Sequence, residues 1–309
     1  MAAPIEGRAR SSKSMSFPLY TVDAFTNKPF AGNPAAVCLV KHDQVLDDET
    51  MQKLATEMNL SETAFVRTLS ATEDFQSGSR YGLRWMTPTI EVALCGHATL
   101  ASAAVLFFCL NNPSPELTFV TLSGELKARR CDPFVSLDLP LNSCEPETVN
   151  DAEELIKLTI GGFAVKELQH CAHTKDLLIL LEENVTRLQL ESMQPHVDQM
   201  IATHNTGRIK GVIVTLGGSE GNGCVDSKGK VYDFVSRYFA PWNGIKEDPV
   251  TGSAHTVLSS YWSKKLGKKA LYARQCSPRG GDLKIQVRDD GRVDIAGEAA
   301  IVLSGNIFI

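Results

Sequence analysis

Residues 84–110 read RWMTPTIEVALCGHATLASAAVLFFCL, and a related stretch, residues 237–262, reads RYFAPWNGIKEDPVTGSAHTVLSSYW. RWMTP matches RYFAP, and the four residues that begin at Cys95 match the four that begin at Thr251. Gly96 and Gly252 lie about half the chain length apart, which is too long a period for a solenoid. The repeat predicts two similar halves related by a pseudo-twofold axis, with two glycine turns that face each other.

Each copy has the pattern of a strand, a proline turn, a glycine turn and a helix. A residue before proline favours extended backbone, so RWMTP and RYFAP are expected to end strands. The first amides of a helix have no partner within it and hold anions well. Two facing helix ends would therefore hold a small carboxylate through the first turns at Gly96, Ala98, Gly252 and Ala254. Alternatively, the glycines only permit tight packing; the duplication, with polar residues at matched places, favours a ligand.

Composition narrows the function. The chain has 309 residues, enough for one or two large cores, and with a net charge of −5 it has no basic run that would suit nucleic acid. Eight cysteines without a CxxC pair indicate neither a disulfide framework nor a zinc site, and they fit the reducing cytoplasm. The most apolar run, residues 98–110, is too short to cross a bilayer. We expect it to be a buried central helix.

Several elements follow from local patterns. Residues 1–14 include the protease site Ile-Glu-Gly-Arg and are interpreted as the remnant of an expression tag. Strands are expected at Phe17–Phe25, Ala35–Val40, Leu117–Arg129 (a hairpin), Val135–Leu141, Leu177–Leu181 and Val212–Leu216. Helices are expected up to Met58 from a cap at Asp47 or Asp48, at Asp151–Ile160, within Leu188–Ala202 with a second start at Pro195, and at Ala254–Leu266. Residues 301–309 are expected to pair back with the first domain.

A few polar residues stand where chemistry could occur. Glu62 lies between a helix and an apolar strand, where it could be a general acid/base or a surface glutamate that accepts from nearby amides. Asn33, in the turn FAGNP, could orient a ligand or stabilise the turn. His170 and His173 fall on opposite faces of an expected strand, which favours surface histidines over a metal site.

Four motifs together resemble the PhzF family of phenazine biosynthesis-like proteins: DAFTNKPFAGNPAAV (23–37), EMNLSETAF (57–65), CGHATLASA (95–103) and EDPVTGSAH (247–255). The resemblance covers the chain from Tyr20 onward and is greatest to the vertebrate branch. It implies an α+β fold like that of diaminopimelate epimerase, with two pseudo-symmetric halves, each a mixed sheet or barrel rolled around a central helix. The first half would comprise residues 15–130 with 298–309, and the second residues 131–297.

The resemblance also implies a function. Family members of this kind are isomerases that shift a proton on a small carboxylate-bearing carbon acid without a cofactor or metal, and they are commonly homodimers. Residue by residue, the family acid/base matches Glu62, and the other catalytic positions match His97, Asp248 and Ser253. The two glycine turns match the segments that hold the substrate carboxylate. The vertebrate branch is named for a WD-repeat protein partner, so a catalytically silent, protein-binding member of the same fold is the alternative.

Cys95 departs from the family pattern. The bacterial isomerases have a small apolar residue before the glycine–histidine pair, whereas related two-base epimerases have a cysteine before each glycine turn. Here the repeat partner of Cys95 is Thr251. Stereoinversion by two opposed thiols is therefore not expected, and Cys95 is interpreted as a small buried residue. A one-base proton shift through Glu62 stays compatible with the sequence.

Overall fold

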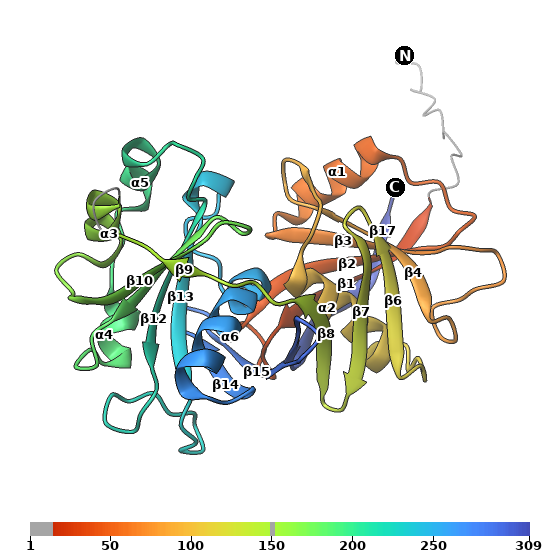
Figure 1. Cartoon of the computed structure of the whole chain (residues 1–309). Helices are drawn as coiled ribbons and strands as arrows, with labels where there is room; N and C mark the ends of the chain where they lie inside the picture. Colours follow the sequence, from red (N-terminus) through yellow and green to blue (C-terminus); the bar gives the residue numbers. More distant parts are fainter. Residues whose placement is uncertain (1–14, 149–151) are drawn as a thin grey trace, which may run out of the picture.

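The computed structural model describes residues 15–148 and 152–309, which form two lobes (Figure 1). The tag expected at residues 1–14 and the helix start expected at Asp151 lie outside the described residues. The first-half elements are β1 (Ser16–Ala24), β2 (Asn33–Val40), α1 (Asp48–Met58), β3 (Glu62–Thr68), β4 (Arg80–Met86), β5 (Glu91–Val92), α2 (Gly96–Ala104), the π-helix η1 (Val105–Cys109), β6 (Glu116–Thr121), β7 (Gly124–Cys131) and β8 (Phe134–Pro140). The second-half elements are β9 (Glu145–Pro146), α3 (Glu153–Ile160), β10 (Val165–Cys171), β11 (Asp176–Leu181), α4 (Arg187–Ser192), α5 (Val197–Thr203), β12 (Gly211–Gly217), β13 (Phe234–Phe239), the 3-10 helix η3 (Pro241–Asn243), α6 (Gly252–Leu266), β14 (Ala270–Gln275), β15 (Gly281–Val287) and β16 (Arg292–Gly297), and the chain ends in β17 (Ala299–Phe308).

The two halves repeat one pattern of strand pairing. In the first, the order β1-β2-β3-β4-β6-β7-β8 has neighbours that are antiparallel, parallel, antiparallel, parallel, antiparallel and antiparallel. In the second, β10-β11-β12-β13-β14-β15-β16 follows the same alternation. Helix α2 comes between β4 and β6 in the chain, as α6 comes between β13 and β14. The predicted duplication of the fold is confirmed.

The halves exchange their last strands. Strand β8 pairs antiparallel with β16, from Val135 opposite Gly297 to Pro140 opposite Arg292. The strand after each then pairs in the other half, because β9 joins β10 and β17 joins β1. The last strand therefore returns to the first half, as expected for residues 301–309. Because β8 pairs with both β7 and β16, pairing alone does not divide the halves at residue 130, and that boundary stays a prediction.

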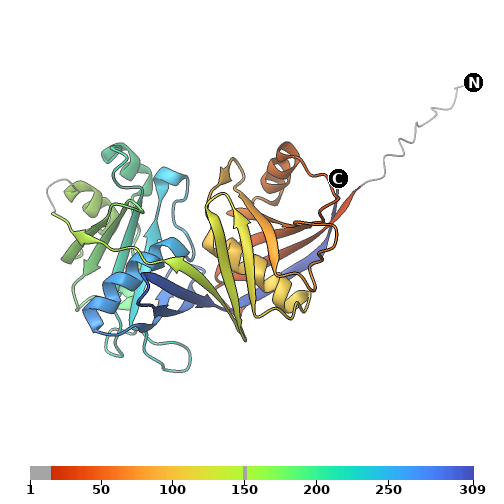
Figure 2. The same cartoon turned by 45° about the vertical axis from the view of Figure 1, so that its right-hand side comes forward.

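A helix fills the centre of each lobe (Figure 2). Every residue of α2 from His97 to Ala104 is buried, and the helix continues into η1, where Leu106 and Phe107 are also buried. Its apolar side chains face in all directions because strands of the first half surround it. The buried residues of α6 include Val257 and Trp262, as the sequence indicated. The sheet is mixed and does not close into a barrel.

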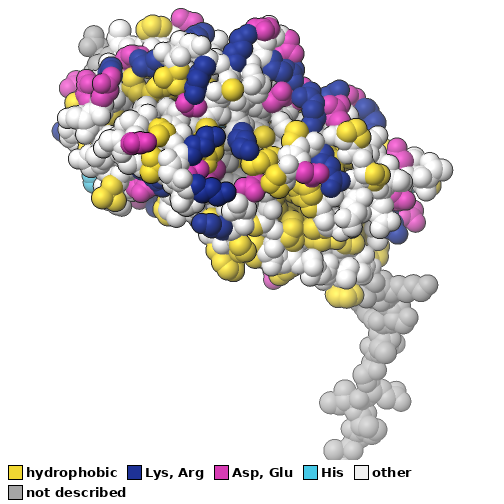
Figure 3. All heavy atoms as spheres, turned by 90° about the horizontal axis from the view of Figure 1, so that it is seen from below, with side chains coloured by type: hydrophobic (Ala, Val, Ile, Leu, Met, Phe, Trp, Pro, Cys, Tyr) yellow, Lys and Arg dark blue, Asp and Glu magenta, His cyan; other side chains and the backbone are white. Residues whose placement is uncertain are grey.

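Three further expectations can be compared with the fold. The helical region at 188–202 divides into α4 and α5, and Pro195 lies two residues before α5 starts at Val197. His170 is half-buried on β10, whereas His173 is exposed in the turn after it. Basic and acidic side chains are intermixed on the face seen in Figure 3. Among the described residues, no helix combines the length and apolarity needed to cross a membrane.

Candidate active site

The site begins where the first turns of α2 and α6 meet. A methyl group built on Gly96 would lie 3.5 Å from the Cα of Gly252, and one built on Gly252 would lie 3.5 Å from the Cα of Gly96. Neither glycine has a positive φ, so close approach, not left-handed backbone, explains the residue type. The first intrahelical bonds are made by the amides of Thr99 and His255, each 3.2 Å from its acceptor. The Ala98 amide interacts with the Cys95 sulfur, and among the described residues the amides of Gly96 and Gly252 have no partner within the helices, so they can bind an anion at one junction.

A cavity of about 1060 Å³ lies at this junction and is lined by both halves. Its polar lining includes Glu62, His97, Asp248 and Ser253, the four candidate catalytic residues. Gly96 and Gly252 line it too. Residues that are far apart in the sequence are therefore brought to one cleft between the halves, which is the geometry that the repeat predicted.

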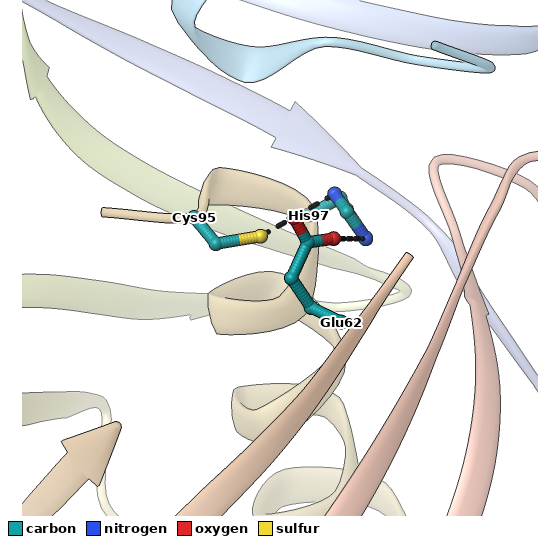
Figure 4. Close-up of side chains that lie close together, drawn as sticks. All are labelled: Glu62, Cys95 and His97. Atoms are coloured by element: carbon teal, nitrogen blue, oxygen red, sulfur yellow. Dashed lines mark hydrogen bonds and ion pairs between the residues drawn. The ribbon is translucent and has the colours of Figure 1, made fainter. Parts of the chain in front are cut away.

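Glu62 is placed by the passage from α1 into β3. Helix α1 ends at Asn59, whose left-handed backbone turns the chain, and Glu62 is the first residue of β3. The residue is 7% exposed, so it is not a glutamate of the open surface. Its Oε2 lies 3.1 Å from Nε2 of His97, with which it forms an ion pair. Figure 4 shows the carboxylate and the imidazole side by side.

His97 contacts both Glu62 and Cys95. Its Nδ1 is 3.5 Å from the Cys95 sulfur, while its Nε2 faces Glu62 (Figure 4). Burial works to lower the pKa of His97, but Cys95 and Glu62 together raise it well above its usual range. Burial works to raise the pKa of Glu62, but the charge of His97 and the bonds from His97 and Cys95 lower it. At neutral pH the pair is therefore a carboxylate beside an imidazolium.

Cys95 remains a neutral thiol. Burial, with Glu62 nearby, raises the pKa of Cys95 to about 11, so little thiolate forms at neutral pH. The residue is 7% exposed, in keeping with the small buried residue that the sequence indicated. Thr251, at the matched place before the second glycine, donates its hydroxyl to Asp248. The two positions therefore do not present a pair of opposed thiols.

Asp248 is held by residues from both halves. The Asn33 side-chain amide donates to Oδ1 of Asp248 at 2.8 Å and to the carbonyl of Val250 at 2.9 Å. Burial raises the pKa of Asp248, against the opposing effect of His97. Asn33 is fully buried as the first residue of β2 and is not part of the cavity wall. It is thus neither a simple turn residue nor a direct wall contact; it supports Asp248 across the halves.

The other proposed residues differ in their exposure. Ser253 is exposed and lines the cavity. Ala98 and Ala254 are buried, and only their backbone amides belong to the helix ends that could bind a ligand. The next residue, His255, is fully buried with Nδ1 2.7 Å from the carbonyl of Thr251, and burial lowers its pKa to about 4. It is therefore a neutral support of the second glycine turn.

Sequence reasoning missed part of the cavity wall. Asp176, Tyr238 and Trp242 line it, together with His173. His173 is exposed as predicted, but its surface is the cavity wall. Tyr238 belongs to the repeated RYFAP, and Trp242 to the residues by which the second copy is longer than the first. The extra residues of the second copy were therefore the sequence signal that could have pointed to Trp242. The sequence around Asp176 contains no comparable signal.

Glu62, Cys95 and His97 have the donor types of a zinc site, and their ligand atoms lie within 4.8 Å of one another. However, the imidazole presents a different ring nitrogen to each of the other two groups. A single ion bound to both neighbours would require a different placement of the ring. The observed arrangement suits proton movement and charge stabilisation between the three groups.

Comparisons with known proteins show the family and the fold. The model of the PhzC-PhzF family, phenazine biosynthesis-like protein, matches residues 22–305. Phenazine biosynthesis-like domain-containing proteins of Bos taurus and Homo sapiens are 53% and 52% identical, each over 95% of this chain and 99% of the relative. A Pseudomonas aeruginosa protein named an uncharacterized isomerase is 41% identical over 95% of this chain and 99% of its own.

Solved structures show the same fold. A PhzF family protein of Enterococcus faecalis superimposes with a TM-score of 0.80 and 36% identity, covering 96% of this chain and all of that one. A hydroxyproline epimerase of Agrobacterium vitis, at 11% identity and a TM-score of 0.51 over 95% of this chain and 93% of its own, shares the fold alone. The architecture is that of the diaminopimelate epimerase-like proteins. The chain belongs to the PhzC-PhzF family of phenazine biosynthesis-like proteins.

Proposed function

We propose that this protein is a cofactor-independent isomerase that moves a proton on a small carbon acid bearing a carboxylate. The observation that carries the proposal is the placement of a buried glutamate, ion-paired to a histidine, in a cavity where two helix N-termini meet. The family relationship and the isomerase name of one relative support the same reaction class.

In the proposed reaction, the substrate carboxylate binds the free amides of the turns at Gly96 and Gly252. Glu62, whose pKa is lowered, is ionised at neutral pH and can act as the base. It takes a proton from a carbon conjugated to the carboxylate; the C–H electron pair moves into the conjugated system, and Glu62, whose acquired proton can exchange with solvent, returns a proton to another carbon. The reaction needs no oxidant, because no electrons leave the substrate.

The charge that develops in this reaction would be stabilised by the helix amides and by the imidazolium of His97. Asp248 and Ser253, which line the same wall, would orient the substrate's polar groups. A single positioned acid/base contributes about 10²–10⁴-fold to a rate, so preorganised electrostatics would supply much of the remainder. Burial of the pair strengthens each of these interactions relative to water.

The test is hydrogen exchange in heavy water with the Glu62→Gln variant. The wild-type protein is incubated with a fractionated extract of small acids, and mass spectrometry follows uptake of deuterium at carbon. We expect Glu62→Gln to slow this uptake by about 10²–10⁴-fold. The matched control is Glu57→Gln, which removes an exposed carboxylate from α1 and should leave the rate unchanged.

Two outcomes would contradict the proposal. Uptake that persists near the wild-type rate in Glu62→Gln would show that Glu62 is not the base. If the wild-type protein exchanged no acid and the Glu62→Gln variant retained all binding to a protein partner, the silent, protein-binding alternative would be favoured.

A further inference from the structure

The duplicated strands can be aligned residue by residue. In the first half, Arg84 of β4 pairs with Phe65 of β3. In the second, Arg237 of β13 pairs with Val214 of β12. Each arginine also begins one copy of the repeat, RWMTP or RYFAP. The sequence repeat and the strand register therefore give the same alignment of the two halves.

This alignment assigns a counterpart to Glu62. Glu62 begins β3 and pairs with Ala35 of β2. At the matched place, Gly211 begins β12 and pairs with Asp176 of β11. The second half thus has a glycine where the first has its glutamate, and an aspartate where the first has an alanine. The carboxylate has moved to the neighbouring strand.

The Asp176 side chain occupies the space that a side chain at residue 211 would need. A methyl group built on Gly211 would overlap both Oδ1 of Asp176 and the hydroxyl oxygen of Tyr238. The Tyr238 hydroxyl donates to Oδ1 of Asp176 at 3.0 Å. Glycine at position 211 is thus required by this carboxylate–phenol pair, and both members of the pair line the cavity.

Among the residues that the structure describes, Asp176, like Asp248, lacks the ion-pair partner that the other buried carboxylates have. Asp23 is ion-paired with Arg279, Asp138 with three arginines, and Glu62 with His97. Within the described residues, Asp176 has no ion pair; its carboxylate interacts with the Tyr238 and Thr174 hydroxyls, and no hydrogen bond of good geometry reaches its Oδ2. It is 1% exposed, and burial raises its pKa to about 6. Burying an unpaired carboxylate is costly, which points to a ligand as the missing partner.

The charges of the cavity indicate which ligand group would fit. Its wall contains the carboxylates of Glu62, Asp176 and Asp248, but among the described residues that line it there is no lysine or arginine. The imidazolium of His97 and the helix ends offset one region of this negative charge. His97 shifts the pKa of Asp248 but is not among the groups that shift the pKa of Asp176, which belongs to the second half and would be complemented by a cation.

We propose that Asp176 binds an ammonium group of the ligand whose carboxylate rests on the two glycine turns. The assignment rests on the proposed function, because the carboxylate must be held for the ammonium group to reach Asp176. Tyr238 is then a positioning residue that fixes the aspartate. The two halves would hold opposite ends of one zwitterionic molecule.

The experiment compares two probes that differ at one ring position, cyclohexanecarboxylate and piperidine-3-carboxylate. Binding to the wild-type protein and to Asp176→Asn is measured by ligand-observed NMR titration, with the fold of each variant checked by circular dichroism. We expect the wild-type protein to bind the ammonium-bearing acid about tenfold or more tightly than the carbocycle. Asp176→Asn should bring the two affinities within about threefold of each other by weakening only the ammonium-bearing acid. The control Asp289→Asn, a change at an exposed aspartate, should retain the full preference.

Each other outcome has a defined meaning. Equal affinities in the wild-type protein, or a preference that survives in Asp176→Asn, would overturn the role of Asp176 and leave the proposed isomerase unaffected. If neither acid bound the cavity, the carboxylate cradle itself would be contradicted, and this inference with it. If Asp176→Asn did not fold, Tyr238→Phe, which leaves the carboxylate in place without its phenol, should reduce the preference; an unchanged preference would overturn the proposal.

Discussion

The two halves share a backbone and differ at the cleft. Both use the same order of strand pairing and place a glycine at the start of the central helix. The first half presents Glu62 and His97 to the cavity, whereas the matched region of the second presents Asp176 and Ser253. The shared backbone therefore fixes the positions from which side chains reach the cleft. The side chains at those positions differ, so each half contributes different chemical groups to the cavity.

The two halves also differ in a matched ion pair that does not involve the candidate catalytic residues. Arg84 makes a two-bonded fork to Glu91, at 2.7 and 2.8 Å, and Arg237 makes the matched fork to Glu247 at the same two distances. The Arg84 side chain is 34% exposed, but that of Arg237 is 6% exposed. Arg237 also donates to carbonyls at the C-terminal end of α4, at Leu190, Glu191 and Met193. The same ion pair is therefore a surface feature in one half and a buried support in the other.

The largest expected effect is a loss of stability when each of the two arginine–glutamate ion pairs is removed in turn. Arg237→Met should lower the free energy of unfolding by about 3–5 kcal/mol, because it leaves a half-buried carboxylate and several carbonyls without a donor. Arg84→Met should cost about 1 kcal/mol or less, because its partners can be solvated. Urea denaturation of both variants measures the difference. Equal losses would contradict the asymmetry between the halves.

The second effect is a gain in the free energy of unfolding when Asp176 is replaced, whereas the arginine substitutions lower it. Burial raises the pKa of Asp176 from 3.8 to about 6, so the unfolded chain loses this proton at lower pH than the folded protein does. The contribution of Asp176 to the free energy of unfolding therefore falls as the pH rises from about 4 to 6. Above pH 6 the ionised carboxylate destabilises the folded protein by the full amount. Asp176→Asn should therefore raise the free energy of unfolding at pH 7.5 by about 2–3 kcal/mol.

Urea denaturation of both proteins at pH 4 and pH 7.5 measures this change. The two proteins should be closer in stability at pH 4, where Asp176 is protonated in the folded protein and about half ionised in the unfolded chain, and should differ most at pH 7.5. A variant that is less stable than the wild-type protein at pH 7.5 would show that Asp176 contributes to the fold, and the case for a missing ligand partner would be lost.

The smallest effect concerns the glycine turns. A methyl group on Gly252 meets only ordinary contacts, with Gly96 at 3.5 Å and Leu139 at 4.0 Å. Gly252→Ala should therefore fold with stability within about 1 kcal/mol of the wild-type protein. Because the methyl group narrows the junction, binding of cyclohexanecarboxylate should weaken by about tenfold. Gly96→Ala is the matched change and should weaken it similarly; if both variants bind normally, the junction does not hold the carboxylate.

Much of the fold followed from the repeat. Proline turns, glycine turns and an apolar run predicted two strand–turn–helix copies, and both central helices are present. The grouping of Glu62 with His97 and Asp248 required the family resemblance, because these residues are close only after the halves close on each other. Local sequence alone favoured a surface residue at Glu62, and only its burial excludes that interpretation.

The rest could not be read from the sequence for physical reasons. Asp176 lies in no motif, and its relation to Glu62 depends on strand register, which the repeat alone does not fix beyond RWMTP and RYFAP. Asn33 was expected in a turn but is the first residue of β2, and its bond to Asp248 joins residues from opposite halves. Such contacts depend on how the halves pack, which local patterns do not encode.

The account depends on a carboxylate held between the two glycine turns, and amide NMR tests this most directly. Cyclohexanecarboxylate is titrated into ¹⁵N-labelled protein while the amide signals of Gly96 and Gly252 are followed. We predict that both signals shift together with a single dissociation constant, and that Gly252→Ala weakens both responses. Shifts at only one glycine, or saturation of the probe elsewhere with both signals unmoved, would contradict a shared site between the halves.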